Sequence, residues 1–223
     1  MTAAHSAQDS NPRHAGFWDR VAERYAKRPI SDEAAYRRKL EATQALMRPE
    51  MEVLEFGCGT GSTALLHAPF VKRILATDIS SKMIEIAEAK AAAEGIANVT
   101  FQRAAFDEIA PAEPGFDMVL GLNILHLLPD RDAGIARVHR LLKPGGLFVS
   151  STVCLGDGMA YFKLIAPLGR ALGLMPLVRV FKVEDLLASL TRGGFQIEQQ
   201  WQPGAGKRFK SVFAIARKVS SNA

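Results

Sequence analysis

Cysteines, metal-ligand clusters and long apolar runs are scarce in this chain of 223 residues. The two cysteines, Cys58 and Cys154, are too few for a disulfide framework, so we expect free thiols in a reducing cytoplasm. No group of cysteines and histidines has metal-ligand spacing, which predicts that the chain binds no metal. No apolar run reaches about 18 residues, and residues 1–16 lack the apolar core of a signal peptide, so no membrane-spanning helix is expected.

The composition is that of a globular protein with a sizeable core. Hydrophobic residues make up 48% of the chain and charged residues 23%, and the net charge is +5. A basic surface can attract RNA, anionic lipid or an acidic substrate. However, the sequence has no lysine- and arginine-rich block like those of nucleic-acid-binding arms. We therefore expect no DNA partner, and the charge pattern argues against RNA as well.

From residue 50 onward, apolar strands alternate with amphipathic helices. Strands are expected at 51–56, 73–77, 99–102, 116–122, 147–153, 195–201 and 209–217. Strands that alternate with helices form a parallel sheet covered on both faces. The turn at 203–206 is too short for a parallel crossover, so the last two strands must form an antiparallel hairpin. The sequence predicts an α/β fold: a Rossmann-like, doubly wound, seven-stranded sheet, mostly parallel, with an antiparallel last strand and helices on both faces.

Four segments can be separated along the chain. Residues 1–15 are polar and are predicted to be a disordered tail, and residues 16–49 a helical N-terminal cap. Within this cap, a helix starts at Phe17, and Ser31 is expected to cap a second one. Residues 50–218 form the main domain. Inside it, residues 156–180 are an apolar insertion with few charges.

The most informative motif is Glu55-Phe56-Gly57-Cys58-Gly59-Thr60-Gly61, which follows an apolar strand. Its pattern, E-x-G-x-G-x-G, differs from the dinucleotide fingerprint G-x-G-x-x-G. It resembles motif I of the class I S-adenosylmethionine (SAM)-dependent methyltransferases. The pattern Phe17-Trp18-Asp19 … Tyr25 … Tyr36 resembles the N-terminal region of ubiquinone/menaquinone-type and "methyltransferase domain 11" enzymes. The cofactor implied is SAM, and its product S-adenosylhomocysteine.

The resemblance assigns roles to these residues. The loop of Gly57, Cys58, Gly59, Thr60 and Gly61 lets the backbone approach the methionyl part of SAM. Glu55 helps to hold the ligand's ammonium group, and Asp78, 17 residues after Gly61, accepts hydrogen bonds from the ribose hydroxyls. Ile79 and Met83 would pack near the adenine. Tyr25 would contact the SAM carboxylate or methyl group, although core packing is a comparable alternative for this ring.

The adenine end departs from the family pattern. Many relatives carry an acid where this chain has Ala105. Phe106 is expected to stack on the adenine instead, and Asp107 is a weaker substitute for the missing acid.

The fourth strand ends in Gly121-Leu122-Asn123-Ile124-Leu125-His126, which resembles the family motif beside the transferred methyl group. Asn123 would contact the methionyl ammonium, with Ile124 beside it. His126 is the candidate catalytic base, and a structural role in the apolar stretch is its alternative. The run Lys143-Pro144-Gly145-Gly146 is expected to reverse the chain before the fifth strand.

The resemblance predicts a SAM-dependent methyltransferase that acts on a small, apolar molecule at oxygen, carbon or nitrogen. The insertion 156–180 would cover the acceptor, rest on a membrane surface or bury a homodimer contact. The alternatives are an RNA methyltransferase, a SAM-binding protein without catalysis and an NAD(P)-dependent oxidoreductase.

Overall fold

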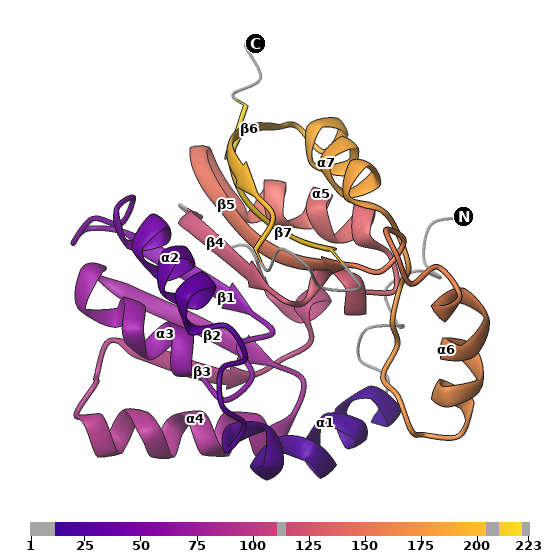
Figure 1. Cartoon of the computed structure of the whole chain (residues 1–223). Coiled ribbons are helices and arrows are strands. Elements are labelled where there is room, and N and C mark those ends of the chain that lie inside the picture. Colours follow the sequence, from indigo (N-terminus) through magenta and orange to yellow (C-terminus); the bar gives the residue numbers. More distant parts are fainter. Residues whose placement is uncertain (1–11, 111–114, 204–209, 220–223) are drawn as a thin grey trace. The chain divides into compact units, whose positions relative to one another are not determined.

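The computed structural model describes residues 12–110, 115–203 and 210–219. The chain forms two compact units, Met1–Ala110 and Pro111–Ala223, and each is described by itself (Figure 1). None of the helices in the described ranges is both long enough and apolar enough to cross a membrane.

The first unit holds three parallel strands in the order β3-β2-β1. Along the chain its elements are α1 (Pro12–Ala26), α2 (Glu33–Gln44), β1 (Glu52–Phe56), α3 (Ser62–His67), the 3-10 turn η1 (Ala68–Phe70), β2 (Arg73–Asp78), α4 (Ser81–Glu94), β3 (Val99–Arg103) and η2 (Phe106–Glu108). Phe56 pairs with Thr77, so the carboxyl ends of β1 and β2 lie side by side. This edge is where a parallel sheet offers a ligand site.

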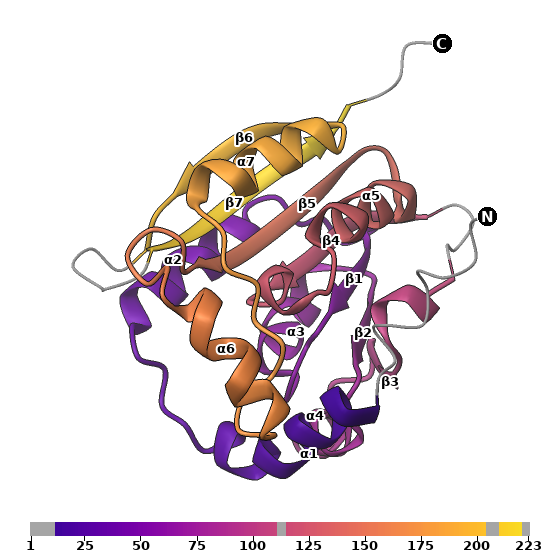
Figure 2. The same ribbon diagram turned by 90° about the vertical axis from the view of Figure 1, so that its right-hand side faces the viewer.

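The second unit holds four strands in the order β4-β5-β7-β6. Its elements are β4 (Phe116–Leu122), η3 (Leu125–Leu127), α5 (Arg131–Leu141), β5 (Leu142–Cys154), α6 (Phe162–Ala171), α7 (Val183–Arg192), β6 (Phe195–Trp201) and β7 (Lys210–Lys218). Strand β4 runs parallel to β5, whereas β7 is antiparallel to both β5 and β6 (Figure 2). The predicted α/β class, the seven strands and the reversed final hairpin are therefore confirmed.

Several helix ends follow the predicted capping pattern. The Ser80 side chain accepts a hydrogen bond from the Met83 amide, and Gly95 ends α4 in the left-handed conformation. Asp130 likewise caps α5. The prediction for α2 was wrong by one residue, because its cap is Asp32, whose carboxylate accepts from the Ala35 amide, and not Ser31.

The first helix begins earlier than the sequence indicated. Helix α1 starts at Pro12, so residues 12–15, which we assigned to the disordered tail, form its first turn. A proline fits there because amides in the first helical turn have no partner within the helix. The other residues of the predicted tail, like the end of the chain from 220 to 223, lie outside the described residues.

The prediction that residues 143–146 reverse the chain was also wrong. Phe116 pairs with Leu142 and Met118 with Leu147, both in the parallel sense, so β5 continues in one direction past this run. The additional residues form a bulge, and Gly145 has φ +71°. Pro144 and the two glycines thus bend the strand without ending it.

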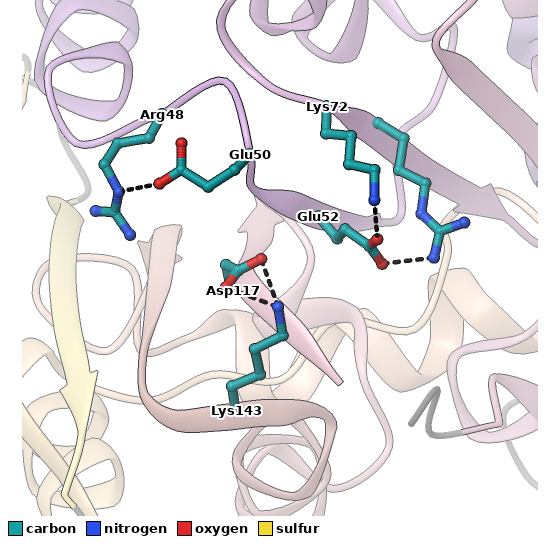
Figure 3. A network of polar contacts seen from close by, with 7 residues as sticks. Arg48, Glu50, Glu52, Lys72, Asp117 and Lys143 are labelled. Atoms are coloured by element: carbon teal, nitrogen blue, oxygen red, sulfur yellow. Dashed lines mark hydrogen bonds and ion pairs between the residues drawn. The ribbon is translucent and has the colours of Figure 1, made fainter. Parts of the chain in front are cut away.

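The amino ends of the strands carry ion pairs (Figure 3). Glu52, at the start of β1, pairs with Lys72 and Arg73. In the second unit, Lys143 Nζ lies 2.9 Å from the Asp117 carboxylate. Because these pairs are at least partly exposed, each contributes little to stability. The Glu52 pairs lie at the opposite end of β1 from the glycine motif.

Candidate functional site

The glycine motif forms a loop in which the backbone is left-handed at alternate residues. Gly57, Gly59 and Gly61 have φ values of 67°, 55° and 75°. A side chain at such angles is strained, so the loop requires its three glycines. The Cys58 amide donates to Thr77 at the end of β2, at 2.9 Å, and the Gly61 amide donates to the Cys58 carbonyl. The loop is therefore fixed against the neighbouring strand.

Asp78 joins this loop to the next helix. Its carboxylate accepts hydrogen bonds from the Gly59 amide and the Ser80 amide, each at 2.9 Å. Burial raises the pKa of Asp78, and backbone hydrogen bonds from Ser80, Gly59 and Ile79 oppose that rise. A carboxylate offers about four lone-pair sites, so this carboxylate keeps acceptor capacity for a hydroxyl group of a ligand.

Glu55 is the least satisfied polar residue beside the loop. It is only 2% exposed, and its Oε2 has no hydrogen-bond partner in the structure. Burial, with a smaller contribution from the Asp78 charge, raises the pKa of Glu55 to about 8. An isolated buried carboxylate is costly, and a cationic group of a ligand would offset that cost.

Helix α1 brings Tyr25 to the same loop. A Cβ built on Gly59 would lie 3.7 Å from the Tyr25 ring, so the ring borders the loop while remaining half-exposed. Partial burial and the charge of Asp78 raise the pKa of Tyr25. From α2, the Tyr36 hydroxyl lies 3.2 Å from Thr63 Oγ1 at the start of α3. Helices α1 and α2 thus place Tyr25 within the influence of Asp78 and Glu55, and Tyr36 within that of Glu55.

Asp19 and Lys90 are two residues of this site that sequence reasoning missed. The Asp19 carboxylate accepts from Ser80 Oγ at 2.6 Å and from the Lys82 amide at 3.1 Å, which fastens α1 to the start of α4. Burial would raise the pKa of Asp19, but these hydrogen bonds lower it. Lys90 Nζ donates to the carbonyl and hydroxyl of Thr60, both at 3.1 Å, and so supports the glycine loop from α4.

The residues predicted near adenine are mostly buried. Met83 is 1% exposed and belongs to the core. The Phe106 ring stacks on Phe56, with centroids 4.0 Å apart and an interplanar angle of 18°. This contact covers one face of the Phe106 ring, and stacking of the ring on adenine stays a prediction. The Ala105 amide donates to Glu108 Oε2, whereas Ile79 remains partly exposed.

The other predicted residues lie in the second unit. Asn123, directly after β4, has φ 57° and is the one residue other than glycine with positive φ in the described part of the chain. Its amide donates to the Ser151 carbonyl at 2.6 Å and its side chain is exposed. Asparagine tolerates this conformation better than most residues, and strained positions cluster at functional sites.

His126 follows in η3, two residues after the partly exposed Ile124. Its Nδ1 is shielded from solvent and has no hydrogen-bond partner. Burial lowers the pKa of His126 to about 4, so the imidazole is neutral at pH 7. A neutral imidazole carries one N–H donor and one acceptor nitrogen, and a pKa of about 4 makes that acceptor a weak base at pH 7.

Comparison with known proteins finds methyltransferase relatives for part of this chain. The family model described as "Methyltransferase domain" matches residues 53–146. The uncharacterized methyltransferase YcgJ of Bacillus subtilis (strain 168) is 31% identical over 102 residues, which are 46% of this chain and 40% of that protein. A ubiquinone biosynthesis O-methyltransferase of Sinorhizobium medicae (strain WSM419) is 28% identical over 194 residues, 86% of this chain and 66% of that protein. The chain thus spans less than two thirds of either relative.

Solved structures agree on the fold. The crystal structure of YcgJ superposes with a TM-score of 0.68 at 19% identity, covering 82% of this chain and 99% of that one. The [4+2]-cyclase SpnF also gives 0.68 at 19% identity, covering 86% of this chain and 83% of its own. Since SpnF is named for a different reaction, these superpositions establish the architecture alone.

Proposed function

We propose, from the premise that this chain carries a class I SAM-dependent methyltransferase domain, that it transfers a methyl group to a small, apolar acceptor. When bound, SAM supplies an activated methyl group and leaves as S-adenosylhomocysteine. The observation that carries the proposal is Glu55, whose buried carboxylate has an oxygen without a partner beside a left-handed glycine loop. These residues fit a ligand that has both an ammonium group and ribose hydroxyls.

In this proposal the first unit holds the cofactor. Glu55 binds the ammonium group, and Asp78 accepts from the ribose hydroxyls with the lone pairs that its backbone hydrogen bonds leave over. Gly57, Gly59 and Gly61 let the backbone approach the ligand. Tyr25 adds an aromatic ring at the loop, and aromatic rings attract cations such as a sulfonium. Methyl transfer then depends mainly on positioning, because the leaving group is already activated.

The second unit carries the residues proposed to act on the acceptor. His126 is the candidate base for the proton of an acceptor hydroxyl or amine; it is neutral at pH 7, and burial, which lowers its pKa to about 4, weakens it as a base. Residues 156–180 carry many apolar side chains and no acid except Asp157, which favours an apolar acceptor. The S. medicae relative is named a ubiquinone biosynthesis O-methyltransferase, which supports an apolar acceptor here.

Calorimetry with SAM, S-adenosylhomocysteine and NADH tests the cofactor, followed by an assay of S-adenosylhomocysteine release over a panel of apolar phenols, amines and activated carbon acids. We expect SAM and its product to bind, NADH not to bind, and at least one acceptor to be turned over. Binding of NADH alone would contradict the proposal. Tight SAM binding without turnover of any acceptor would support a non-catalytic role, and salt-sensitive tRNA binding would point to an RNA substrate.

The variant Asp78→Asn is expected to weaken SAM binding by about 1–3 kcal/mol, the scale of hydrogen bonds to a charged group. An asparagine keeps one oxygen for the Gly59 or Ser80 amide but loses the charge that faces the ligand. Asp130→Asn, at the cap of α5, is the matched control and should leave affinity unchanged. Calorimetry measures both variants, and equal SAM affinity in wild type and Asp78→Asn would show that the ribose lies elsewhere.

The variant His126→Ala is expected to lower turnover about 10²-fold or more, the usual contribution of a general base, with SAM affinity preserved. His67 provides a control, because it is also buried, with its pKa lowered to about 4 by burial, but lies in α3. Steady-state kinetics and calorimetry on both variants separate catalysis from folding. If His126→Ala retains full turnover, the imidazole is only a packing residue.

A further inference from the structure

Helix α6 exposes a stripe of large apolar side chains. Leu164 is 82% exposed, and Leu168 and Leu172 are each 64% exposed. They recur every four residues and therefore lie on one face of the helix, together with the exposed Tyr161 and Ile165. We call these five residues the α6 stripe. It spans about 16 Å along the axis, at a rise of about 1.5 Å per residue.

The opposite side of α6 holds the helix in place. Ala166 is buried, and a Cβ added to Gly169 would lie 2.9 Å from Met175 Sδ, so the segment after the helix packs closely on that side. The outward direction of the stripe follows from this packing, because the small residues face the protein and the leucines face away. Contiguous exposed apolar surface of this kind marks an interaction site.

Charge distinguishes the candidate occupants of the stripe. Residues 158–182 contain no aspartate or glutamate, but they include Lys163, Arg170 and Arg179, all exposed. A second copy of the chain would bring a second set of these cations against the first, on a protein whose net charge is already +5. A small acceptor molecule would cover only part of a stripe about 16 Å long. An anionic lipid surface matches both the length and the charge.

We propose that the α6 stripe docks the protein on the surface of an anionic lipid bilayer, with α6 lying in the interface. The leucines and Ile165 would enter the boundary between headgroups and acyl chains, with Tyr161 at its polar level. Lys163, Arg170 and Arg179 would be attracted by the anionic headgroups. The proposal does not depend on methyl transfer, since it rests on the exposure and charge of this segment alone.

Vesicle co-sedimentation of the full chain tests this, with phosphatidylcholine vesicles that contain or lack phosphatidylglycerol, at physiological ionic strength and without SAM. We expect binding to the anionic vesicles and little to the neutral ones. The double variant Leu164→Ser/Leu168→Ser should lower the partition coefficient about tenfold or more, because each substitution removes apolar carbon groups that would be buried in the interface. Lys163→Gln/Arg170→Gln/Arg179→Gln should also lower it about tenfold or more.

Matched variants separate the stripe from general surface effects. Ile30→Ser/Leu66→Ser replaces two half-exposed apolar residues of the first unit, and Lys27→Gln/Arg28→Gln/Arg37→Gln removes three exposed charges there. Both controls should retain vesicle binding. No binding to anionic vesicles, equal binding to neutral ones, or equal losses in the controls would overturn the proposal. So would analytical ultracentrifugation that finds a wild-type dimer and a monomeric Leu164→Ser/Leu168→Ser variant.

Discussion

Replacing Glu55 with glutamine is expected to stabilise the unliganded protein by about 3 kcal/mol at pH 7 while removing the contact that we propose for the ammonium group of SAM. Stability and binding should therefore change in opposite directions. A protein of this size would gain about 6–12 °C in Tm. Such an outcome would identify Glu55 as a residue kept for function at the expense of the fold.

The expected gain in stability follows from the pH range over which Glu55 stays protonated in the folded protein. Its pKa is raised from 4.5 to about 8 in the folded protein, with burial as the main cause. Between these two values the folded state binds more protons than the unfolded state, so wild-type stability falls as pH rises. Glutamine has the shape of the protonated acid and carries no charge. The difference between variant and wild type should accordingly be small near pH 4.5 and grow up to about pH 8.

Urea denaturation of both proteins across this pH range measures the effect. Glu52→Gln, in the same strand, is the matched control, because hydrogen bonds from Arg73 and Lys72 outweigh its slight burial and lower the pKa of Glu52. Loss of that carboxylate should not stabilise the protein as pH rises. A stability difference for Glu55→Gln that stays constant with pH would show that Glu55 is ionised in the folded state throughout.

The raised pKa of Glu55 also predicts that protons are released when SAM binds. An ammonium group beside Glu55 favours the ionised carboxylate, so SAM binding at pH 7 should release close to one proton per molecule bound. Calorimetry in buffers of different ionisation enthalpy measures this release, which Glu55→Gln should abolish along with much of the affinity. Release of no proton by wild type would place the ammonium away from Glu55.

The features that could be predicted are those that depend on residues adjacent in the sequence. The glycine pattern 57–61, the caps at Ser80 and Asp130 and the antiparallel pairing of β6 with β7 each depend on a few neighbouring residues, whereas the predicted turn 203–206 lies largely outside the described residues. Local chain sterics and hydrogen bonding fix such features, and the alternation of strands and helices then limits the fold to few topologies.

Features that depend on distant residues could not be predicted in this way. Asp19 meets Ser80 across 61 positions and Lys90 meets Thr60 across 30, and neither pair leaves a pattern in the sequence. Phe106 stacks on Phe56 at the end of β1. The sequence does not reveal this contact, because the two rings are far apart along the chain. The bulge at 143–146 arises because the pairing of β5 with β4 outweighs a local turn preference.

The variant Gly61→Ala is expected to destabilise the protein by about 2–5 kcal/mol, the sum of overpacking and left-handed strain. A Cβ at this position would lie 2.7 Å from both Ala87 Cβ and Phe101 Cε1, in a backbone with φ +75°. Neither neighbour is the flexible end of a long side chain, so α4 or β3 would have to move. Urea denaturation with unchanged m-values measures the loss.

Gly95→Ala separates the two contributions. Gly95 has φ +67°, close to that of Gly61, but a Cβ there meets nothing within 4 Å. The Gly95→Ala variant should therefore lose about 1 kcal/mol of stability, the strain of a left-handed alanine alone. The excess cost at Gly61 then measures how tightly the loop is pressed between α4 and β3, and equal costs would contradict that packing. Because the Gly59 amide is bonded to Asp78 in the same loop, a displaced Gly61 should also weaken SAM binding, whereas Gly95→Ala should not.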